Sequence, residues 1–301
     1  MPPSALQRSL AVVSLIYSAM IWGLIWYPYR LLEEAGVSGV ASSFFTYAVP
    51  FLVFGWLQRR SLHAARGRWG WLLALALVAG WTNLAYVLAM LQGEVVRVLL
   101  LFFLSPLWTV LFARLLLKER LNRAGWAVMG LAAGGAMVML WRPDGGWPLP
   151  TNRAEWLALS AGVAFALSNV ISRHLGGVAE GARSVSIWFG VLVLTVVGLA
   201  IYPDELGFMA DARAGIWLLL VGIGLALGSV TYAVQYGLAR VPANQAIVIF
   251  LVELVVAGIA SYFLAHERMG VQEWVGALMI VAASLFSGHM EDTPSKETVH
   301  A

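Results

Sequence analysis

The sequence contains no cysteine, and only 12% of its 301 residues are Asp, Glu, Lys or Arg. The absence of cysteine excludes a disulfide framework and a thiolate metal site. The five histidines are scattered and show neither HxxxH nor HExxH spacing, so we expect no metal and no cofactor. The net charge of +3 does not indicate a nucleic-acid partner, because the basic residues lie between apolar runs.

Motifs of catalysis and nucleotide binding are also missing. Gly222 and Gly224 have the spacing of a Gly-rich loop but lack the preceding strand and the following lysine. No GxSxG motif is present, so nothing supports an intramembrane hydrolase and we expect no enzyme. Without an ATP-binding module, any uphill transport must use an ion gradient or exchange.

Apolar residues dominate what is present. They make up 60% of the chain, and the mean hydropathy is +0.80. A soluble protein of this length could not bury so much apolar surface, so the composition predicts an integral membrane protein. The first apolar run lacks a small-residue cleavage site, and we expect it to remain as a spanning helix rather than a signal peptide.

Ten apolar runs of about 20 residues, the length that a spanning helix needs, divide the chain. A Pro- and Gly-rich interval separates the fifth run from the sixth. We therefore expect an all-α integral membrane protein with five-helix repeats at 1–142 and 154–289, a loop at 143–153 and a disordered tail at 290–301. The predicted spans are 9–28, 38–57, 69–91, 95–117, 121–141, 154–175, 184–202, 214–238, 244–265 and 271–287.

The fourth and fifth runs repeat in the ninth and tenth. The segment 99–135 matches 247–283 without a gap at a shift of 148 residues. Because each copy holds five spans, an odd number, the two copies are expected to lie inverted in the membrane. We expect the repeated glutamates to pair with a nearby arginine or to cap the next helix. Matching residues include Phe102 and Phe250, Glu119-Arg120 and Glu267-Arg268, and Trp126 and Trp274.

The distribution of Lys and Arg predicts the orientation. If the N-terminus is inside, the inner segments carry 13 of the 19 basic residues. The positive-inside rule then places both termini in the cytoplasm of a multi-pass protein of a bacterial-type inner membrane.

Several motifs resemble the drug/metabolite transporter superfamily in its ten-helix form with two EamA-type domains. They are the run Ala19-Met20-Ile21-Trp22-Gly23, Ser105-Pro106 in the fourth span, the repeated Glu119 and Glu267, and Gly125 and Gly130. The abundance of Trp and Tyr is most similar to the YddG-type exporters of aromatic amino acids and paraquat-like cations. One departure is Glu253-Leu254 where the first copy has Ser105-Pro106, so the two halves are expected to bend differently.

Polar groups in a membrane are costly and usually face inward, which suggests a site between the third, fourth, eighth and ninth spans. The first and sixth spans would complete it. Each residue also has a structural interpretation, since amides and phenols can simply bond neighbouring helices. The candidate substrate-binding residues are Trp22, Asn83, Tyr86, Trp108, Asn169, Tyr232, Gln235, Tyr236 and Gln245.

Glu253 is the main candidate for a proton- or cation-binding site. It lies within the ninth span with no cation within one turn of its own helix, although Arg97 near the start of the fourth span is a conceivable partner. A carboxyl group there can carry a proton or bind a cationic amine, or it can form a hydrogen bond across the bundle. Pro106 is expected to kink its helix rather than to bind a ligand.

These features favour a secondary transporter of small metabolites, most of all amino acids including aromatic ones, by alternating access around a central cavity. Export is what the resemblance implies. The alternatives are an exporter or exchanger of lipophilic cations, drugs or another metabolite, and, in a different class, an intramembrane enzyme or lipid-handling scaffold. The expected partners are a small-molecule substrate and the lipid bilayer, and a monomer is sufficient to enclose the cavity.

Overall fold

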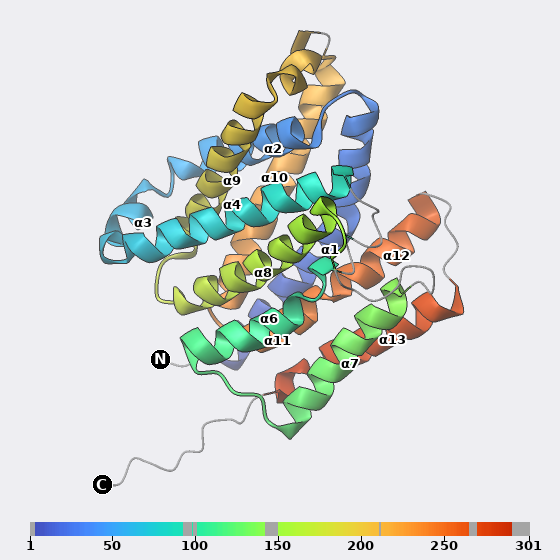
Figure 1. The fold of residues 1–301 in the computed structure, drawn as a ribbon. Helices are drawn as coiled ribbons and strands as arrows, with labels where there is room; N and C mark the ends of the chain where they lie inside the picture. The colour runs from blue at the N-terminus through green and yellow to red at the C-terminus, as the bar shows by residue number, and fades with distance from the viewer. Residues whose placement is uncertain are drawn as a thin grey trace.

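The computed structural model describes residues 4–92, 98, 101–141, 150–210, 212–264 and 270–290, and every regular element in these ranges is a helix (Figure 1). A helix lies in each of the ten expected intervals. Within the described residues, six helices are long and apolar enough to cross a membrane, and shorter apolar helices accompany them. The predicted class of helical membrane protein is therefore confirmed.

Up to residue 141, short helices lie between the long ones in two places. The segment of arginines after the second predicted span folds partly into two short helices, α3 and η1. The elements are α1 (Ala5–Glu34), α2 (Gly39–Gly55), α3 (Arg59–Ala64), η1 (Arg66–Arg68), α4 (Trp69–Gln92), α6 (Ser105–Phe112), η2 (Ala113–Leu117) and α7 (Arg123–Leu140).

From residue 150 the same order of long helices returns. The elements are α8 (Arg153–His174), α9 (Glu180–Ile201), η4 (Pro203–Ala210), α10 (Ala214–Leu238), α11 (Ala243–Phe250), α12 (Val252–Leu264), α13 (Val271–Phe286) and η5 (Ser287–His289).

Some sequence expectations concern residues outside the described ranges. These are Arg97 as a partner for Glu253, the repeated turn at Glu267-Arg268, most of the loop at 143–153 and the tail from 291.

The first helix is longer than predicted. It begins at Ser4, whose hydroxyl accepts the Gln7 backbone N–H while the Gln7 side chain accepts the Ser4 N–H, and it continues through Pro28 to Glu34. The expected end at Pro28 was wrong. A proline removes one backbone donor, and the polar turn beyond it is supported by an ion pair between Arg30 and Glu34.

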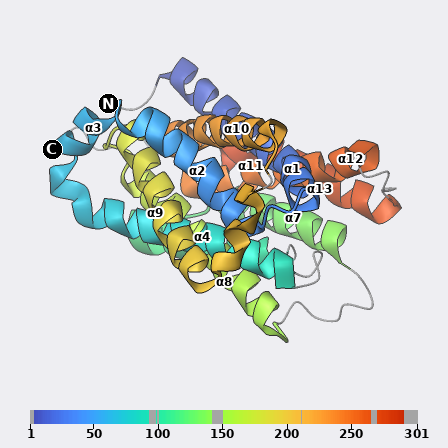
Figure 2. The same ribbon diagram turned by 90° about the horizontal axis from the view of Figure 1, so that it is seen from above.

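Helices of the two halves pack chiefly against each other. α4 packs against α8 and α9, and its repeat counterpart α10 packs against α1 and α2. Likewise α6 packs against α8, and α12 against α1. The remaining pairs, α2 with α9 and α7 with α13, join counterparts directly, and Figures 1 and 2 place α7 beside α13 at one edge of the bundle. This exchange of partners is the pattern of an approximate two-fold arrangement.

Small residues let these helices approach closely. An added Cβ at Gly190 of α9 would fall on the Ala76 backbone of α4, and one at Gly80 would fall on the Gly190 carbonyl group. The counterpart crossing of α2 and α10 is similarly tight, since a Cβ at Gly224 would lie 2.6 Å from the Thr46 carbonyl oxygen. Such crossings suit membrane bundles, where packing rather than the hydrophobic effect holds helices together.

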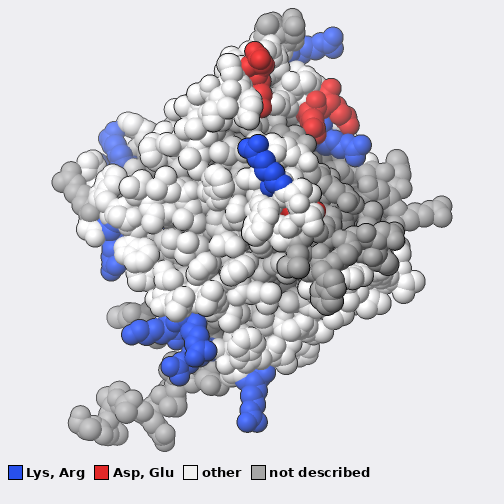
Figure 3. Space-filling model, in the orientation of Figure 1, with Lys and Arg blue, Asp and Glu red and all other residues white. Residues whose placement is uncertain are grey.

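The surface is largely uncharged. On the face shown in Figure 3, white residues cover the broad middle, and basic side chains gather along the lower left edge. Large apolar side chains such as Leu218, Val271 and Leu285 are 73%, 82% and 76% exposed. A surface of this kind is suited to contact with lipid tails rather than water.

We predict that Gly190→Ala lowers the thermal unfolding temperature in detergent by several degrees. The added methyl group meets a backbone carbonyl that cannot turn aside, and overpacking of this kind costs about 1–3 kcal/mol. The matched control is Gly222→Ala, whose Cβ would enter open space. Equal unfolding temperatures for the two variants would contradict the close crossing.

Candidate functional site

Two helices are interrupted at repeat-equivalent positions. The fourth span is helical at 101–102, turns at 103–104 and resumes as α6. The ninth span is interrupted only at Leu251, between α11 and α12, where the backbone stays in the right-handed region with φ of −62° and ψ of −16°. Pro106 in the first turn of α6 accounts for the first break. The second half has Glu253-Leu254 in place of Ser105-Pro106, and its helix is interrupted without a proline. The two interruptions nevertheless lie at equivalent positions of the repeat.

Five aromatic rings meet beside these breaks. Phe102 and Phe250, which are repeat counterparts, each come directly before an interruption. The ring of Phe165 on α8 lies 5.3 Å from that of Phe102 and 5.9 Å from that of Phe250, measured between centroids. Trp22 of α1 lies 5.4 Å from Phe250, and Tyr86 of α4 lies 4.9 Å from Phe102. The rings contact one another in this conformation, and we call them the central aromatic cluster.

Glu253 stands next to this cluster, in the first turn of α12. Its backbone carbonyl presses against α1, where a Cβ at Gly23 would lie 2.8 Å from the carbonyl oxygen. Gly23 directly follows Trp22, so this contact places Glu253 beside the cluster. Within the described residues no ion pair involves Glu253. The start of a helix favours an anion, so the break itself creates a suitable place for this carboxylate.

Several buried polar atoms have no hydrogen-bond partner among the described residues. Asn169 of α8 is 4% exposed with an unpaired amide nitrogen, and Asn244 of α11 is 1% exposed with both amide atoms unpaired. Buried polar groups are normally paired, so groups left open are candidates for contact with a ligand or water. The other unpaired atoms on these spans are Asn83 Oδ1, Ser105 Oγ and Trp108 Nε1.

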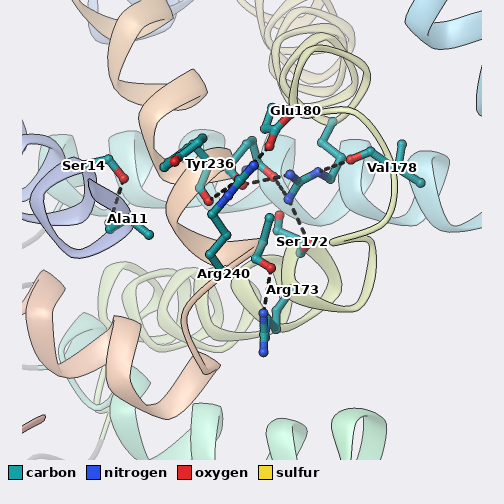
Figure 4. Close-up of polar contacts among 11 residues, drawn as sticks. Ala11, Ser14, Ser172, Arg173, Val178, Glu180, Tyr236 and Arg240 are labelled. Atoms are coloured by element: carbon teal, nitrogen blue, oxygen red, sulfur yellow. Dashed lines mark hydrogen bonds and ion pairs between the residues drawn. The ribbon is translucent and has the colours of Figure 1, made fainter. Parts of the chain in front are cut away.

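A polar network occupies one end of the bundle, where α1 begins, α10 ends and α11 begins; we call it the basal end. Figure 4 shows Arg240 reaching toward Glu180, at 2.7 Å between Nη1 and Oε1, with its guanidinium 3.7 Å from the centre of the Tyr236 ring. Arg183 is fully buried and donates to the carbonyl oxygens of Ser172 and Val178.

Glu119 joins the first half to this network. Its Oε1 lies 3.5 Å from Arg173 Nε, and its Oε2 accepts the backbone N–H of Ala243 at 3.0 Å. Burial raises the pKa of the Glu119 carboxyl above its usual value, while the charge of Arg173 and the N–H groups of Ala243 and Asn244 oppose that shift.

Comparison with known proteins decides the family, because residues 9–141 and 152–288 both match the model of the EamA-like transporter family. The chain belongs to the EamA-like transporter family. As a member, it is a multi-span membrane transporter, and its relatives are transporters rather than enzymes.

Three relatives of this EamA-like transporter have similar length. Protein RarD of Streptomyces exfoliatus is 24% identical and covers 87% of this chain and 83% of its own. The riboflavin transporter of Rhizobium johnstonii is 28% identical (85% and 83%), and the S-adenosylmethionine uptake transporter of Rickettsia prowazekii is 24% identical (79% and 76%). A crystal structure with a TM-score of 0.70 covers 93% of this chain and 96% of that chain at 17% identity, which shows the fold alone.

The transporter places its sequence-predicted residues in two groups. Trp22, Tyr86 and Glu253 lie at the central aromatic cluster, while Asn83, Trp108 and Asn169 supply unpaired polar atoms on the surrounding spans. The second group belongs to α10 and α11. The Oε1 and the backbone carbonyl oxygen of Gln235 both accept hydrogen bonds from Arg183. The ring of Tyr236 lies against the guanidinium of Arg240. Tyr232 is 44% exposed, whereas Gln245 is 7% exposed.

Sequence reasoning missed Arg183 and Asn244. Each stands near the start of its helix, at position 183 in α9 and position 244 in α11. The available signal was a polar residue at the start of a span that becomes apolar within a few residues, since such a group needs a partner inside the bundle.

An apolar cavity of about 160 Å³ lies on the far side of the fourth-span break, between α6 and α7. Phe103 lines it and stands edge-on to Phe102 of the central aromatic cluster, with ring centroids 5.3 Å apart. The other lining residues are Leu104, Pro106, Leu107, Ala133, Gly134, Ala136 and Met137.

We predict that Arg183→Gln destabilises the transporter strongly, by about 3 kcal/mol or more, because glutamine cannot replace four hydrogen bonds to buried acceptors. Thermal unfolding in detergent measures the effect. The control is Arg30→Gln, which removes only an exposed ion pair with Glu34 and should leave the unfolding temperature nearly unchanged. A small effect of Arg183→Gln would show that the buried guanidinium is not a structural anchor.

Proposed function

We propose that this protein is a secondary active transporter that exports small metabolites, chiefly amino acids including aromatic ones, by alternating access. The observation that carries the proposal is the meeting of two interrupted spans, one from each copy, at an aromatic cluster beside a half-buried carboxylate. Interrupted helices near a repeat interface are how many transporters bind substrates at mid-membrane.

The chemistry around the breaks suits a molecule with a ring and a polar head. Rings of Trp22, Phe165 and Phe250 offer faces and edges on which an aromatic side chain can stack. Glu253 can pair with an ammonium group. The open Nδ2 of Asn169 can donate to a carboxylate or carbonyl oxygen, and the open Oδ1 of Asn83 can accept an N–H or O–H of the substrate. We assign Trp108, Tyr232, Gln235, Tyr236 and Gln245 to the walls of the path that leads away from this site.

The arrangement in the membrane follows from the repeat and the charges. We propose ten spans in two inverted halves, 1–142 and 154–289, with both termini in the cytoplasm of a bacterial inner membrane. The excess of basic residues on the segments of one side supports this orientation. Because one chain supplies both halves, a monomer is sufficient.

The direction and energy source are part of the proposal. The resemblance to YddG-type exporters supports export, whereas one relative is named for uptake of S-adenosylmethionine. No nucleotide-binding motif occurs in the sequence, so uphill transport would draw on an ion gradient or exchange, with Glu253 as the proton or cation carrier.

A second candidate substrate class is lipophilic organic cations. The observation that favours it is the position of Glu253, three residues after Phe250 and against Gly23, which follows Trp22 of the central aromatic cluster. A cation there can be held by the carboxylate and by aromatic faces together.

Counterflow in proteoliposomes tests both classes. Vesicles with the purified protein are preloaded with unlabelled phenylalanine, tyrosine or tryptophan, diluted, and supplied with labelled threonine, methionine or each aromatic amino acid. We expect transient accumulation that depends on the preload. If vesicles with folded protein accumulate no amino acid, amino acids are not its substrates. The same assay with labelled tetraphenylphosphonium then tests lipophilic cations.

Glu253→Gln tests the carrier role. We expect the variant to lose at least about tenfold of the accumulation driven by a pH gradient, because the neutral amide cannot bind and release a proton. Counterflow should persist but require a higher substrate concentration, because the amide cannot form an ion pair with an ammonium group. Glu34→Gln is the matched control, since that carboxylate is exposed and paired only with Arg30. Normal gradient-driven uptake by folded Glu253→Gln protein would show that Glu253 is not the proton or cation carrier.

A further inference from the structure

The repeated Glu-Arg turn of the sequence has a defined contact in its first copy. The helical turn η2 ends at Leu117 and is followed by Lys118, which adopts a left-handed conformation with φ of 60°. The Glu119 N–H donates to the Ala113 carbonyl oxygen at 3.2 Å. This turn directs the Glu119 side chain across the bundle, where it is only 12% exposed. The contact thus joins the end of the fourth span to the start of the ninth.

The start of α11 has no capping side chain of its own. Pro242 precedes it and makes no side-chain cap hydrogen bond. The first N–H groups of a helix have no partner within the helix, and a carboxylate there both accepts them and opposes the helix dipole. Glu119 accepts the Ala243 N–H at 3.0 Å and also bonds the Asn244 N–H. The cap of α11 is therefore supplied by the other half of the chain.

Neighbouring contacts make this role specific. The helix that follows Glu119 along the chain, α7, is capped by the Asn122 side chain, which accepts the Gly125 N–H at 2.7 Å. Glu119 is therefore not needed there. Arg173 fixes the carboxylate from the side, because its Nη1 also donates to the Ala239 carbonyl oxygen at 2.8 Å, just before α11 begins.

We propose that Glu119 is a positioning residue for transport, which holds the start of α11 against the fourth and sixth spans and thereby keeps the basal end closed. Release of the cap frees α11, whose far end carries Phe250 and the break beside Glu253. The inference rests on the proposed alternating access. It adds that one carboxylate of the first half controls the position of the substrate-lining span of the second half.

The absence of native cysteine provides a clean test. Ala113, fully buried in a small cluster with Val170 and Ala243, is changed to cysteine as the only thiol, and its rate of modification by a maleimide is measured in proteoliposomes without substrate. In this background we expect Glu119→Ala to raise the labelling rate about tenfold, because it removes a charge-assisted cap. Glu119→Gln, which keeps a neutral acceptor, should give an intermediate rate.

Glu34→Ala in the same background is the control, since it removes an exposed carboxylate at the end of α1 far from its start. Its labelling rate should equal that of the parent. A parent-like rate in folded Glu119→Ala protein, or an equal rise in Glu34→Ala, would overturn the proposal. If Glu119→Ala does not fold, a parent-like rate in Glu119→Gln decides against it. The labelling experiment uses no substrate, so its result can be interpreted even if the protein shows no counterflow of amino acids.

Discussion

Inside a bilayer no water is available to bond the backbone, so every N–H and C=O group must find a partner within the protein. An interrupted helix breaks that rule locally and is tolerated only where other helices cover it. The structure meets this constraint fully on the ninth span, where every residue of α11 is buried. On the fourth span Val98, Leu101 and Phe102 are likewise buried. The stretches around the two breaks therefore lie in the interior, where side chains of α1, α4 and α8 contact them.

The same constraint accounts for the division between rings and polar atoms. Aromatic side chains fill the space at the breaks without adding polar groups, and they contact each other at centroid distances between 4.9 and 6.0 Å. Polar atoms that stay open, such as those of Asn169 and Asn244, lie on the helices around them. A centre of this kind is closed by weak ring contacts, which a stacking ligand can replace at little cost.

Much of the fold could be predicted from the sequence because hydropathy reports directly on membrane residence. The ten apolar intervals each hold a helix, and the repeat offset that pairs Phe102 with Phe250 also pairs the two breaks. The continuation of α1 beyond Pro28 was not predictable from the apolar pattern, since polar residues extend the helix past the last apolar turn. The break at Leu251 was missed because no proline or glycine marks it.

The candidate site was predicted less completely, for a physical reason. Helical periodicity places Gln235 and Tyr236 on one face, but it does not reveal what that face contacts. Arg183 comes from another helix and binds Gln235, so the contact depends on the tertiary arrangement. The expected pairing of Glu119 with an arginine is met by Arg173, but its cap on α11 was hidden, because a capping interaction was sought along the chain rather than across it. Unpaired atoms such as those of Asn244 can be recognised only once the surrounding helices are in place.

The contact between Glu119 and Ala243 also bears on how the protein is made. The two residues lie 124 positions apart, so the ribosome releases Glu119 long before the segment that it caps exists. Until then the Glu119 carboxylate has no Ala243 N–H to accept. The early chain is thus a set of inserted helices awaiting their counterparts, and the basal end can assemble only after α11 enters the membrane. During synthesis of the second half, the first half must therefore remain inserted in the membrane and able to pack against the helices that follow.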